Sequence, residues 1–265
     1  MLATSMQTKT RINSSVHRRV VVTGAANGLG LAIAKRFAAD DALLLLVDSD
    51  KAVLSRPGEN PLSTEKTFAI VKDLADPDAG TFVFGEAAKT IGLVDVLINN
   101  AAWSFHKPML EVSTQEFDRV VNVNQRAPFL LTQEFLRQIS SAAVRPHDPV
   151  IVNIASVNAL AGNPNLVPYA GTKGALTAMT RAMAVELKDL NVRVNAISPA
   201  AIETYVTKNL IVAGVIDPPK LFEKYLIQRF ATCEEIAELV AYLCSDAATY
   251  VNGANWVIDG GYVAQ

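Results

Sequence analysis

A tyrosine and a lysine four residues apart, Tyr169 and Lys173, form the pair in this sequence best suited to acid–base chemistry. Residues i and i+4 of an α-helix lie on one face, so a phenol and an ammonium at this spacing can address one site. A free tyrosine has a pKa of about 10, and a cation within about 4–6 Å favours the phenolate. The pair is therefore a candidate proton donor and acceptor, although two surface residues of a helix can have the same spacing.

A glycine-rich turn near the start of the chain could hold a phosphate group. Residues 20–23 form a short β-branched run, and residues 31–37 have the apolar spacing of a helix. Glycines let the backbone turn sharply and approach a pyrophosphate, while the N-terminus of the following helix supplies free N–H groups. Strand, turn and helix in this order predict a phosphate-binding unit, with a simple tight turn as the alternative. Its candidate ligands are Gly24, Asn27, Gly28, Leu29 and Gly30.

An aspartate, Asp48, ends the next apolar run at residues 43–47. A carboxylate about 20 residues after the glycine turn can accept hydrogen bonds from the ribose hydroxyls of a dinucleotide. It would repel a 2′-phosphate, and neither Asn27 nor Ser49 offers a compensating cation. The residues therefore favour NAD over NADP, with a plain surface aspartate as the alternative.

Short, continuously apolar runs alternate with helical patterns along the rest of the chain, which predicts a parallel sheet covered on both faces. The further strands are expected at 67–71, 94–98, 149–154, 192–197 and 256–258, and the helices at 78–91, 114–140 with a bend near Pro128, 169–187 and 234–244. We predict one doubly wound α/β domain over residues 20–265, with a mostly parallel, seven-stranded sheet. In such sheets ligands bind at the carboxyl ends of the strands, which places Ser156 on the same rim as Gly24 and Asp48.

Composition narrows the classes of function. The chain has 265 residues, 50% hydrophobic and 19% charged, which is typical of a globular domain. Its net charge of −2 does not indicate the excess of positive charge that is typical of proteins that bind nucleic acid or an anionic membrane. The two cysteines and three histidines are scattered, so we expect no metal site and a soluble protein in the reducing cytoplasm.

Two segments outside the regular pattern carry separate expectations. Residues 1–19 contain no acidic residue and four basic ones, which suits a flexible leader or a transit-like peptide. Residues 203–230 are rich in aromatic and aliphatic residues without a clean period. They are interpreted as a mobile lid over a cleft, with a surface loop and short helix as the alternative.

Five ordered motifs resemble those of the short-chain dehydrogenase/reductase family, from about residue 20 to the end. Residues 23–30 match its TGxxxGxG cofactor turn, residues 169–173 its YxxxK motif and residues 259–261 its C-terminal turn. Ser156 and Asn124 fall where the two remaining catalytic residues of the family lie. Two departures replace a family glycine by alanine, at Ala102 and Ala200, and put the local backbone in question.

The resemblance implies a Rossmann fold and a proton-transfer mechanism. Tyr169 would exchange the proton of a substrate hydroxyl or carbonyl, and Lys173 would lower the pKa of Tyr169 and bind the nicotinamide ribose. Ser156 would hold the substrate oxygen, and Asn124 would position a water in a proton relay. It further implies a homo-oligomer, with a tetramer as the commonest state of the family.

The same resemblance, together with the rim described above, assigns binding residues. The cofactor residues comprise the glycine turn with Tyr169 and Lys173, and in addition Asp48, Asp73, Leu74, Asn100, Ala101, Ala102, Pro199, Ile202 and Thr204. The candidate substrate residues follow the fourth and fifth strands or belong to the lid, and are Trp103, His106, Asn158, Asn163 and Tyr205.

The function expected from the sequence is therefore an NAD(H)-dependent oxidoreductase that interconverts a secondary alcohol and its ketone. A polyol or sugar, a cyclic alcohol or a hydroxylated ring would suit the mixed pocket. An NADPH-dependent carbonyl or 3-oxoacyl reductase and a non-catalytic NAD sensor are the alternatives. Retention of all four catalytic residues favours an enzyme.

Overall fold

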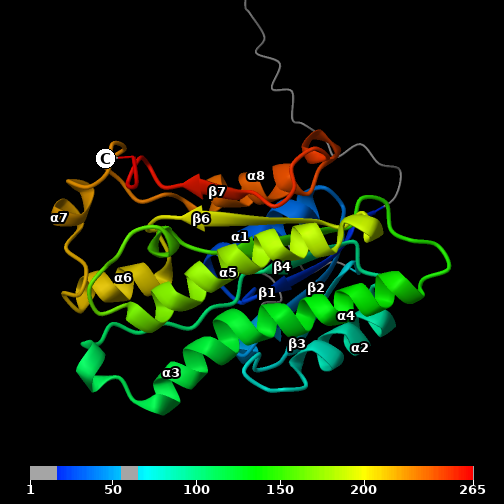
Figure 1. Cartoon of the computed structure of the whole chain (residues 1–265), viewed down its shortest axis with the longest axis horizontal. Coiled ribbons are helices and arrows are strands. Elements are labelled where there is room, and N and C mark those ends of the chain that lie inside the picture. The colour runs from blue at the N-terminus through cyan, green and yellow to red at the C-terminus, as the bar shows by residue number, and fades with distance from the viewer. Residues whose placement is uncertain (1–16, 55–64, 265) are drawn as a thin grey trace, which may run out of the picture.

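Seven strands form one sheet in the order β3-β2-β1-β4-β5-β6-β7 within residues 17–54 and 65–264, the part of the chain that this computed structural model describes (Figure 1). Every neighbouring pair is parallel, which confirms the doubly wound fold. The strand order reverses between β1 and β4, where such sheets bind ligands. The strands are β1 (Arg19–Thr23), β2 (Leu43–Asp48), β3 (Thr67–Val71), β4 (Val96–Asn99), β5 (Val150–Ile154), β6 (Arg193–Pro199) and β7 (Asn255–Ile258).

Helices cover both faces of this sheet. In Figure 1, α2, α4 and α5 lie in front of the sheet, and α1 and α8 lie behind it. The α-helices are α1 (Gly28–Ala39), α2 (Ala79–Thr90), α3 (Thr114–Val121), α4 (Ala127–Ser141), α5 (Val167–Glu186), α6 (Tyr205–Val212), α7 (Pro218–Phe222) and α8 (Cys233–Leu243). None of the helices described is both long enough and apolar enough to cross a membrane.

The two faces of the sheet bury separate hydrophobic clusters. Side chains alternate across a strand, so Val20 and Val22 of β1 pack with α1 and α8, whereas Val21 packs with α2 and α4. All residues of β5 and β6 are buried, as expected for strands covered on both sides. The strand ends that carry polar residues are thereby held on a rigid frame.

The long helix predicted over residues 114–140 is three elements. A capping box at Ser113 and Glu116 starts α3, and a π-helical turn at Asn122–Arg126 separates α3 from α4. The irregularity therefore lies just before the predicted bend at Pro128, which occupies the first turn of α4. The extra residue of a π turn changes which side chains face inward, and Asn124 becomes buried.

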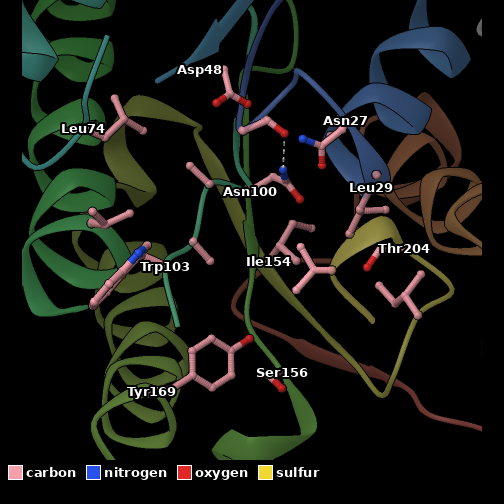
Figure 2. Close-up of a pocket in the computed structure, with 18 of the residues that line it drawn as sticks. Asn27, Leu29, Asp48, Leu74, Asn100, Trp103, Ile154, Ser156, Tyr169 and Thr204 are labelled. Carbon is pink, nitrogen blue, oxygen red and sulfur yellow. Dashed lines mark hydrogen bonds between the residues drawn. The ribbon is translucent and has the colours of Figure 1, made fainter. Parts of the chain in front are cut away.

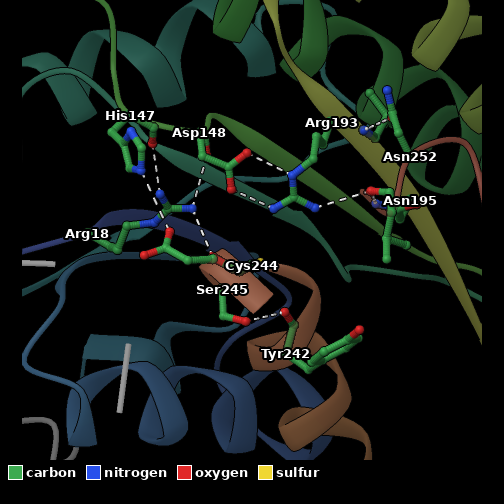
Figure 3. Close-up of polar contacts among 12 residues, drawn as sticks. Arg18, His147, Asp148, Arg193, Asn195, Tyr242, Cys244, Ser245 and Asn252 are labelled. Atoms are coloured by element: carbon green, nitrogen blue, oxygen red, sulfur yellow. Dashed lines mark hydrogen bonds and ion pairs between the residues drawn. The ribbon is translucent and has the colours of Figure 1, made fainter. Parts of the chain in front are cut away.

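The folded domain begins earlier than predicted. Residues 1–16 lie outside the described part, but Arg18 and Arg19, assigned to the flexible leader, are ordered. Arg18 is only 8% exposed and donates hydrogen bonds to the carbonyl oxygens of His147, Asp148 and Cys244, as Figure 3 shows. Arg19 opens β1 and pairs with Asp95. The leader was placed too far into the chain because a basic composition does not reveal these carbonyl acceptors.

A buried ion pair continues this polar cluster. Arg193 donates to both carboxylate oxygens of Asp148, at 2.8 and 2.6 Å, and the two side chains are 6% and 11% exposed. Arg193 and Asn195 also donate to the carbonyl oxygen of Val251 (Figure 3). These bonds tie the loop before β5, the start of β6 and the loop before β7 together, at the end of the sheet opposite the predicted site.

Candidate active site

A cavity of about 450 Å³ opens at the carboxyl ends of the strands. Every residue predicted to bind a cofactor lines it, from Gly24 to Thr204, together with Ser156. In Figure 2, Asp48 lies at the top of the cavity and Tyr169 and Ser156 at the bottom, with Asn100 between them. The cavity is therefore elongated, with a carboxylate at one end and the acid–base candidates at the other.

The glycine turn is shaped so that a phosphate group could bind close to its backbone. Gly24 has φ of +66°, and a Cβ atom added to it would lie 2.8 Å from Cα of Ala101. A Cβ on Gly30 would lie 2.0 Å from the carbonyl oxygen of Gly24, so no larger residue fits there. The N-cap residue of α1, Asn27, makes no side-chain cap, which leaves the first N–H groups of the helix available to an anion.

Asn100 holds this turn against the sheet. Its side-chain amide donates to the carbonyl oxygens of Thr23 and Gly24, at 2.8 and 3.1 Å, and its backbone N–H donates to the Thr23 hydroxyl. The end of β4 and the glycine turn are thus fixed as one unit. Their separation in the sequence gives no hint of this contact.

The Asp48 carboxylate is held at the end of the cavity that suits an adenosine. Oδ2 accepts from the backbone N–H of Ala26 at 2.9 Å, and Oδ1 accepts from that of Asp50 at 3.0 Å. Each oxygen keeps a lone pair for a ribose hydroxyl. The side chain is therefore oriented before any ligand binds.

Two cations near this end were missed in the sequence. Lys72 lines the cavity but is paired with Asp76 and Asp78, and Arg119 lines it but is paired with Asp73. Burial works to raise the pKa of Asp73, but its hydrogen bonds from the Ala75 N–H and Arg119 outweigh that effect and hold the pKa below its usual value. The direct succession of Lys72 and Asp73 after β3 was the signal available.

Three of the four predicted catalytic residues meet at the other end. Ser156 follows β5, and its Oγ accepts from the backbone N–H of Asn158 at 3.1 Å. In Figure 2 the Tyr169 hydroxyl lies near Ser156. Lys173, one turn further along α5, is 2% exposed, and its Nζ donates to the carbonyl oxygen of Ile154 at 2.6 Å. The helix and the strand end together bring a hydroxyl, a phenol and an ammonium to one wall of the cavity.

Burial dominates the protonation of this group. It raises the pKa of Tyr169, against the opposing effect of the nearby Ser156 hydroxyl, and it lowers the pKa of Lys173 to about 8. The predicted lowering of the Tyr169 pKa by Lys173 is not what the structure shows. The Lys173 ammonium is directed to Ile154 and lies 5.6 Å from the centre of the Tyr169 ring. Its remaining N–H groups are free to bind a ligand in the cavity.

Asn124 lies behind the cavity wall. Its amide accepts from the backbone N–H of Trp103 at 2.8 Å and donates to the Trp103 carbonyl oxygen and to the Thr172 hydroxyl. The side chain is 1% exposed and fully engaged. It holds Trp103, which lines the cavity, against the turn of α5 that carries Lys173. Its role in a water relay stays a prediction.

The predicted substrate residues divide into two groups. Trp103 lines the cavity, and Asn158 and Asn163 lie directly behind Ser156 in a hydrogen-bonded row. His106 and Tyr205 are exposed and are not among the residues that line the cavity. Tyr205 starts α6 and points outward, whereas its neighbours Thr204 and Val206 contribute to the cavity.

The two alanines that replace family glycines cause no backbone strain. Within the described residues, the non-glycine positions with positive φ are Asp41, Asp148, Asn165 and Asn191, so Ala102 and Ala200 adopt ordinary conformations. Both also line the cavity.

Comparisons with known proteins agree with this geometry. The family model described as enoyl-(acyl carrier protein) reductase matches residues 24–263. Meso-2,3-butanediol dehydrogenase of Serratia marcescens is 34% identical over 245 residues, which cover 92% of this chain and 94% of that protein.

Two solved structures share the fold over nearly the whole chain. The complex of 4-hydroxyisoleucine dehydrogenase with NADH has a TM-score of 0.85 at 28% identity and covers 94% of this chain and 100% of its own. A protein described as an NAD(P)-dependent gluconate 5-dehydrogenase from Beutenbergia cavernae, with bound NADP, has a TM-score of 0.86 at 33% identity. The match covers 95% of this chain and 99% of that protein.

Proposed function

The chain belongs to the short-chain dehydrogenase/reductase family, and on that premise we propose that it is an NAD(H)-dependent dehydrogenase that interconverts a secondary alcohol and its ketone. The observation that carries the proposal is one elongated cavity with the glycine turn and Asp48 at one end and Ser156, Tyr169 and Lys173 at the other. A bound nicotinamide ring would supply or accept the hydride.

The residues of the chain would move the proton. The Tyr169 hydroxyl gives a proton to the carbonyl oxygen in reduction and takes it from the alcohol in oxidation. Ser156, beside it, holds the same oxygen. Lys173 would hold the nicotinamide ribose with the N–H groups that Ile154 does not use.

We propose NAD as the cofactor because of Asp48. Its carboxylate is fixed by two backbone N–H groups, and a 2′-phosphate beside it would be repelled. The nearby cations Lys72 and Arg119 are committed to aspartates of their own. Related structures hold NADH or NADP, so they do not distinguish the two cofactors. The proposal of NAD therefore depends on Asp48 and on the pairing of Lys72 and Arg119.

Titration of the chain with NADH and NADPH, followed by nucleotide fluorescence, tests this choice. We expect NADH to bind more tightly, and Asp48→Asn to narrow the difference by about tenfold or more, because one full charge is removed. Asp50→Asn, at an exposed carboxylate two residues further along the chain, is the matched control, because it leaves the backbone N–H that Asp50 donates to Asp48 in place. Tighter binding of NADPH by the unchanged chain would refute the proposal.

For the substrate we propose a polyol, a cyclic alcohol or a hydroxylated ring. The wall beside Tyr169 combines the Trp103 ring with the hydroxyl of Ser156 and the row of asparagines behind it. A panel of secondary alcohols with NAD, monitored by the absorbance of NADH, should include 2,3-butanediol, cyclopentanol and sugar alcohols. Tyr169→Phe should abolish turnover and leave NADH binding within about threefold, since it removes only the proton donor.

An NADPH-dependent oxoacyl reductase is the second candidate, supported by 33% identity over 248 residues to the 3-oxoacyl-(acyl-carrier-protein) reductase of Thermotoga maritima. Reduction of acetoacetyl-CoA with NADPH, in preference to every alcohol tested, would favour it. NADH binding without turnover of any substrate would instead favour the non-catalytic sensor.

We further propose that the chain forms a homo-oligomer, with a tetramer as the expected state, through the outer faces of α4 and α5. Phe129 and Val185 are 46% and 72% exposed there, and Gly171 and Gly174 have open space where a side chain would be. Small residues allow another helix to approach closely, and burial of the exposed apolar residues against that helix would stabilise the contact. Light scattering tests the proposal.

We also propose a cytoplasmic location. Both cysteines, Cys233 and Cys244, are buried as free thiols and form no disulfide, which suits a reducing compartment.

A further inference from the structure

A row of hydrogen bonds runs from the C-terminal segment to the proposed catalytic serine. The Tyr262 hydroxyl donates to Oδ1 of Asn163 at 3.1 Å, and Nδ2 of Asn163 donates to Oδ1 of Asn158 at 2.8 Å. Asn158 then donates to Oγ of Ser156 twice, from Nδ2 at 3.2 Å and from its backbone N–H at 3.1 Å. Four side chains are thus linked across 106 positions of the sequence, from residue 156 to residue 262.

The row has a direction. An asparagine amide offers an oxygen that only accepts and a nitrogen that only donates, so each link orients the next. Ser156 Oγ has two lone pairs and one proton, and the two bonds from Asn158 occupy both lone pairs. Only the proton of Ser156 remains to be donated, and the Tyr169 hydroxyl lies near Ser156 in Figure 2.

The far end of the row is anchored by packing. Tyr262 follows β7 in a turn where Gly260 and Gly261 have positive φ, and the Asp259 carboxylate accepts from two backbone N–H groups of this turn. The Tyr262 ring packs on Tyr225, with the ring centres 5.2 Å apart. In Figure 1 the C-terminus lies beside α7, next to the segment predicted to be a lid.

We propose that Asn158, Asn163 and Tyr262 are positioning residues, which fix the Ser156 proton toward the Tyr169 hydroxyl and the substrate oxygen, so that Ser156 acts as a donor to the reacting oxygen. This inference rests on the proposed function. A donor to this oxygen stabilises the phenolate of Tyr169 and the negative charge that develops on a carbonyl oxygen. With both amides turned over, Ser156 would instead donate to Asn158 and lose this capacity.

Two substitutions break the row without adding charge. Asn163→Leu removes the donor that orients Asn158, and Tyr262→Phe removes the hydroxyl that orients Asn163. The difference in tyrosinate absorbance between each protein and its Tyr169→Phe counterpart isolates the titration of Tyr169 among the six tyrosines. Tyr250→Phe, at a fully exposed tyrosine, is the matched control.

We expect Asn163→Leu to raise the pKa of Tyr169 by about half a unit or more, because a donor to the phenolate is weakened. Tyr262→Phe should cause a smaller rise, and Tyr250→Phe none. With a substrate, kcat should fall about tenfold in Asn163→Leu and the pH profile of kcat/KM should move the same way, with NADH binding unchanged.

An unchanged Tyr169 titration in both variants overturns the inference, whatever their stability. A loss of thermal stability with an unchanged pH profile also overturns it, since that is the sign of a purely structural contact. Should Asn163→Leu not fold, Tyr262→Phe decides by its own titration. Failure of the unchanged chain to oxidise any alcohol would refute the proposed function, and the titration would still decide the orientation of Ser156.

Discussion

Replacement of Lys173 by methionine is expected to stabilise the chain and to abolish its activity. The Lys173 ammonium is fully buried, and burial lowers its pKa from 10.5 to about 8. At about 1.36 kcal/mol per pKa unit, this difference means that the charged lysine destabilises the folded chain by about 3 kcal/mol at neutral pH. Methionine has a similar length and no charge, so it removes that cost.

The lost hydrogen bond to the Ile154 carbonyl offsets about 1 kcal/mol of this gain. About 2 kcal/mol remains, which corresponds to a rise in Tm of roughly 4–8 °C for a chain of this size. Thermal unfolding of Lys173→Met and of the unchanged chain at pH 7, without nucleotide, measures the difference. Lys188→Met, at an exposed lysine, controls for the loss of a surface charge.

The gain in stability from Lys173→Met depends on pH. Below pH 8 the lysine is charged in both the folded and the unfolded chain, so the advantage of methionine is complete. Between pH 8 and 10.5 the folded chain loses the proton first, and the unchanged chain gains stability relative to the variant. The advantage should therefore shrink to nothing near pH 10, and above pH 10.5 the variant should be less stable by about 1 kcal/mol, because of its lost hydrogen bond. An advantage that is equal at pH 7 and pH 10, or a variant less stable at pH 7, would show that the buried charge is not the cause.

Two further predictions concern the glycine turn and the polar cluster at the other end of the sheet. Gly30→Ala should abolish NADH binding in a fluorescence titration, because its Cβ would meet the Gly24 carbonyl oxygen at 2.0 Å; Gly85→Ala, with open space at its Cβ, should instead stabilise α2 by about 0.5–1 kcal/mol. Asp148→Asn keeps the positive φ of 45° but leaves Arg193 as a buried, unpaired charge, so urea unfolding should show a loss of about 3–5 kcal/mol. Asp189→Asn at an exposed turn is its control, and a loss below about 1 kcal/mol would contradict the role given to the pair.

The elements of the fold follow from local patterns. β-branched and leucine-rich runs predicted every strand end to within two residues, because strands covered on both faces must be apolar throughout. The glycine turn was predictable for a similar reason, since Gly24 and Gly30 occupy positions where a side chain cannot fit. Helix ends were less exact. Helix α5 begins at Val167, because Pro168 suits the first turn better than Tyr169 does.

Long-range contacts decided what the local patterns could not. Arg18 belongs to the folded domain because three carbonyl groups from distant loops meet it, and Lys72 and Arg119 reach the cavity only because β3 and α3 converge there. Such contacts join residues far apart in the chain, and composition gives no measure of them.

The sequence by itself determined which groups this protein has available for chemistry: a phenol and an ammonium one helical turn apart, a serine at a strand end, and a carboxylate after a glycine turn. The tertiary structure alone decided how they are protonated and oriented. Burial sets the pKa values of Tyr169 and Lys173, and the direction of the Ser156 proton depends on Tyr262. Desolvation and hydrogen-bond direction are properties of the surroundings in space, which the order of residues along a chain does not specify.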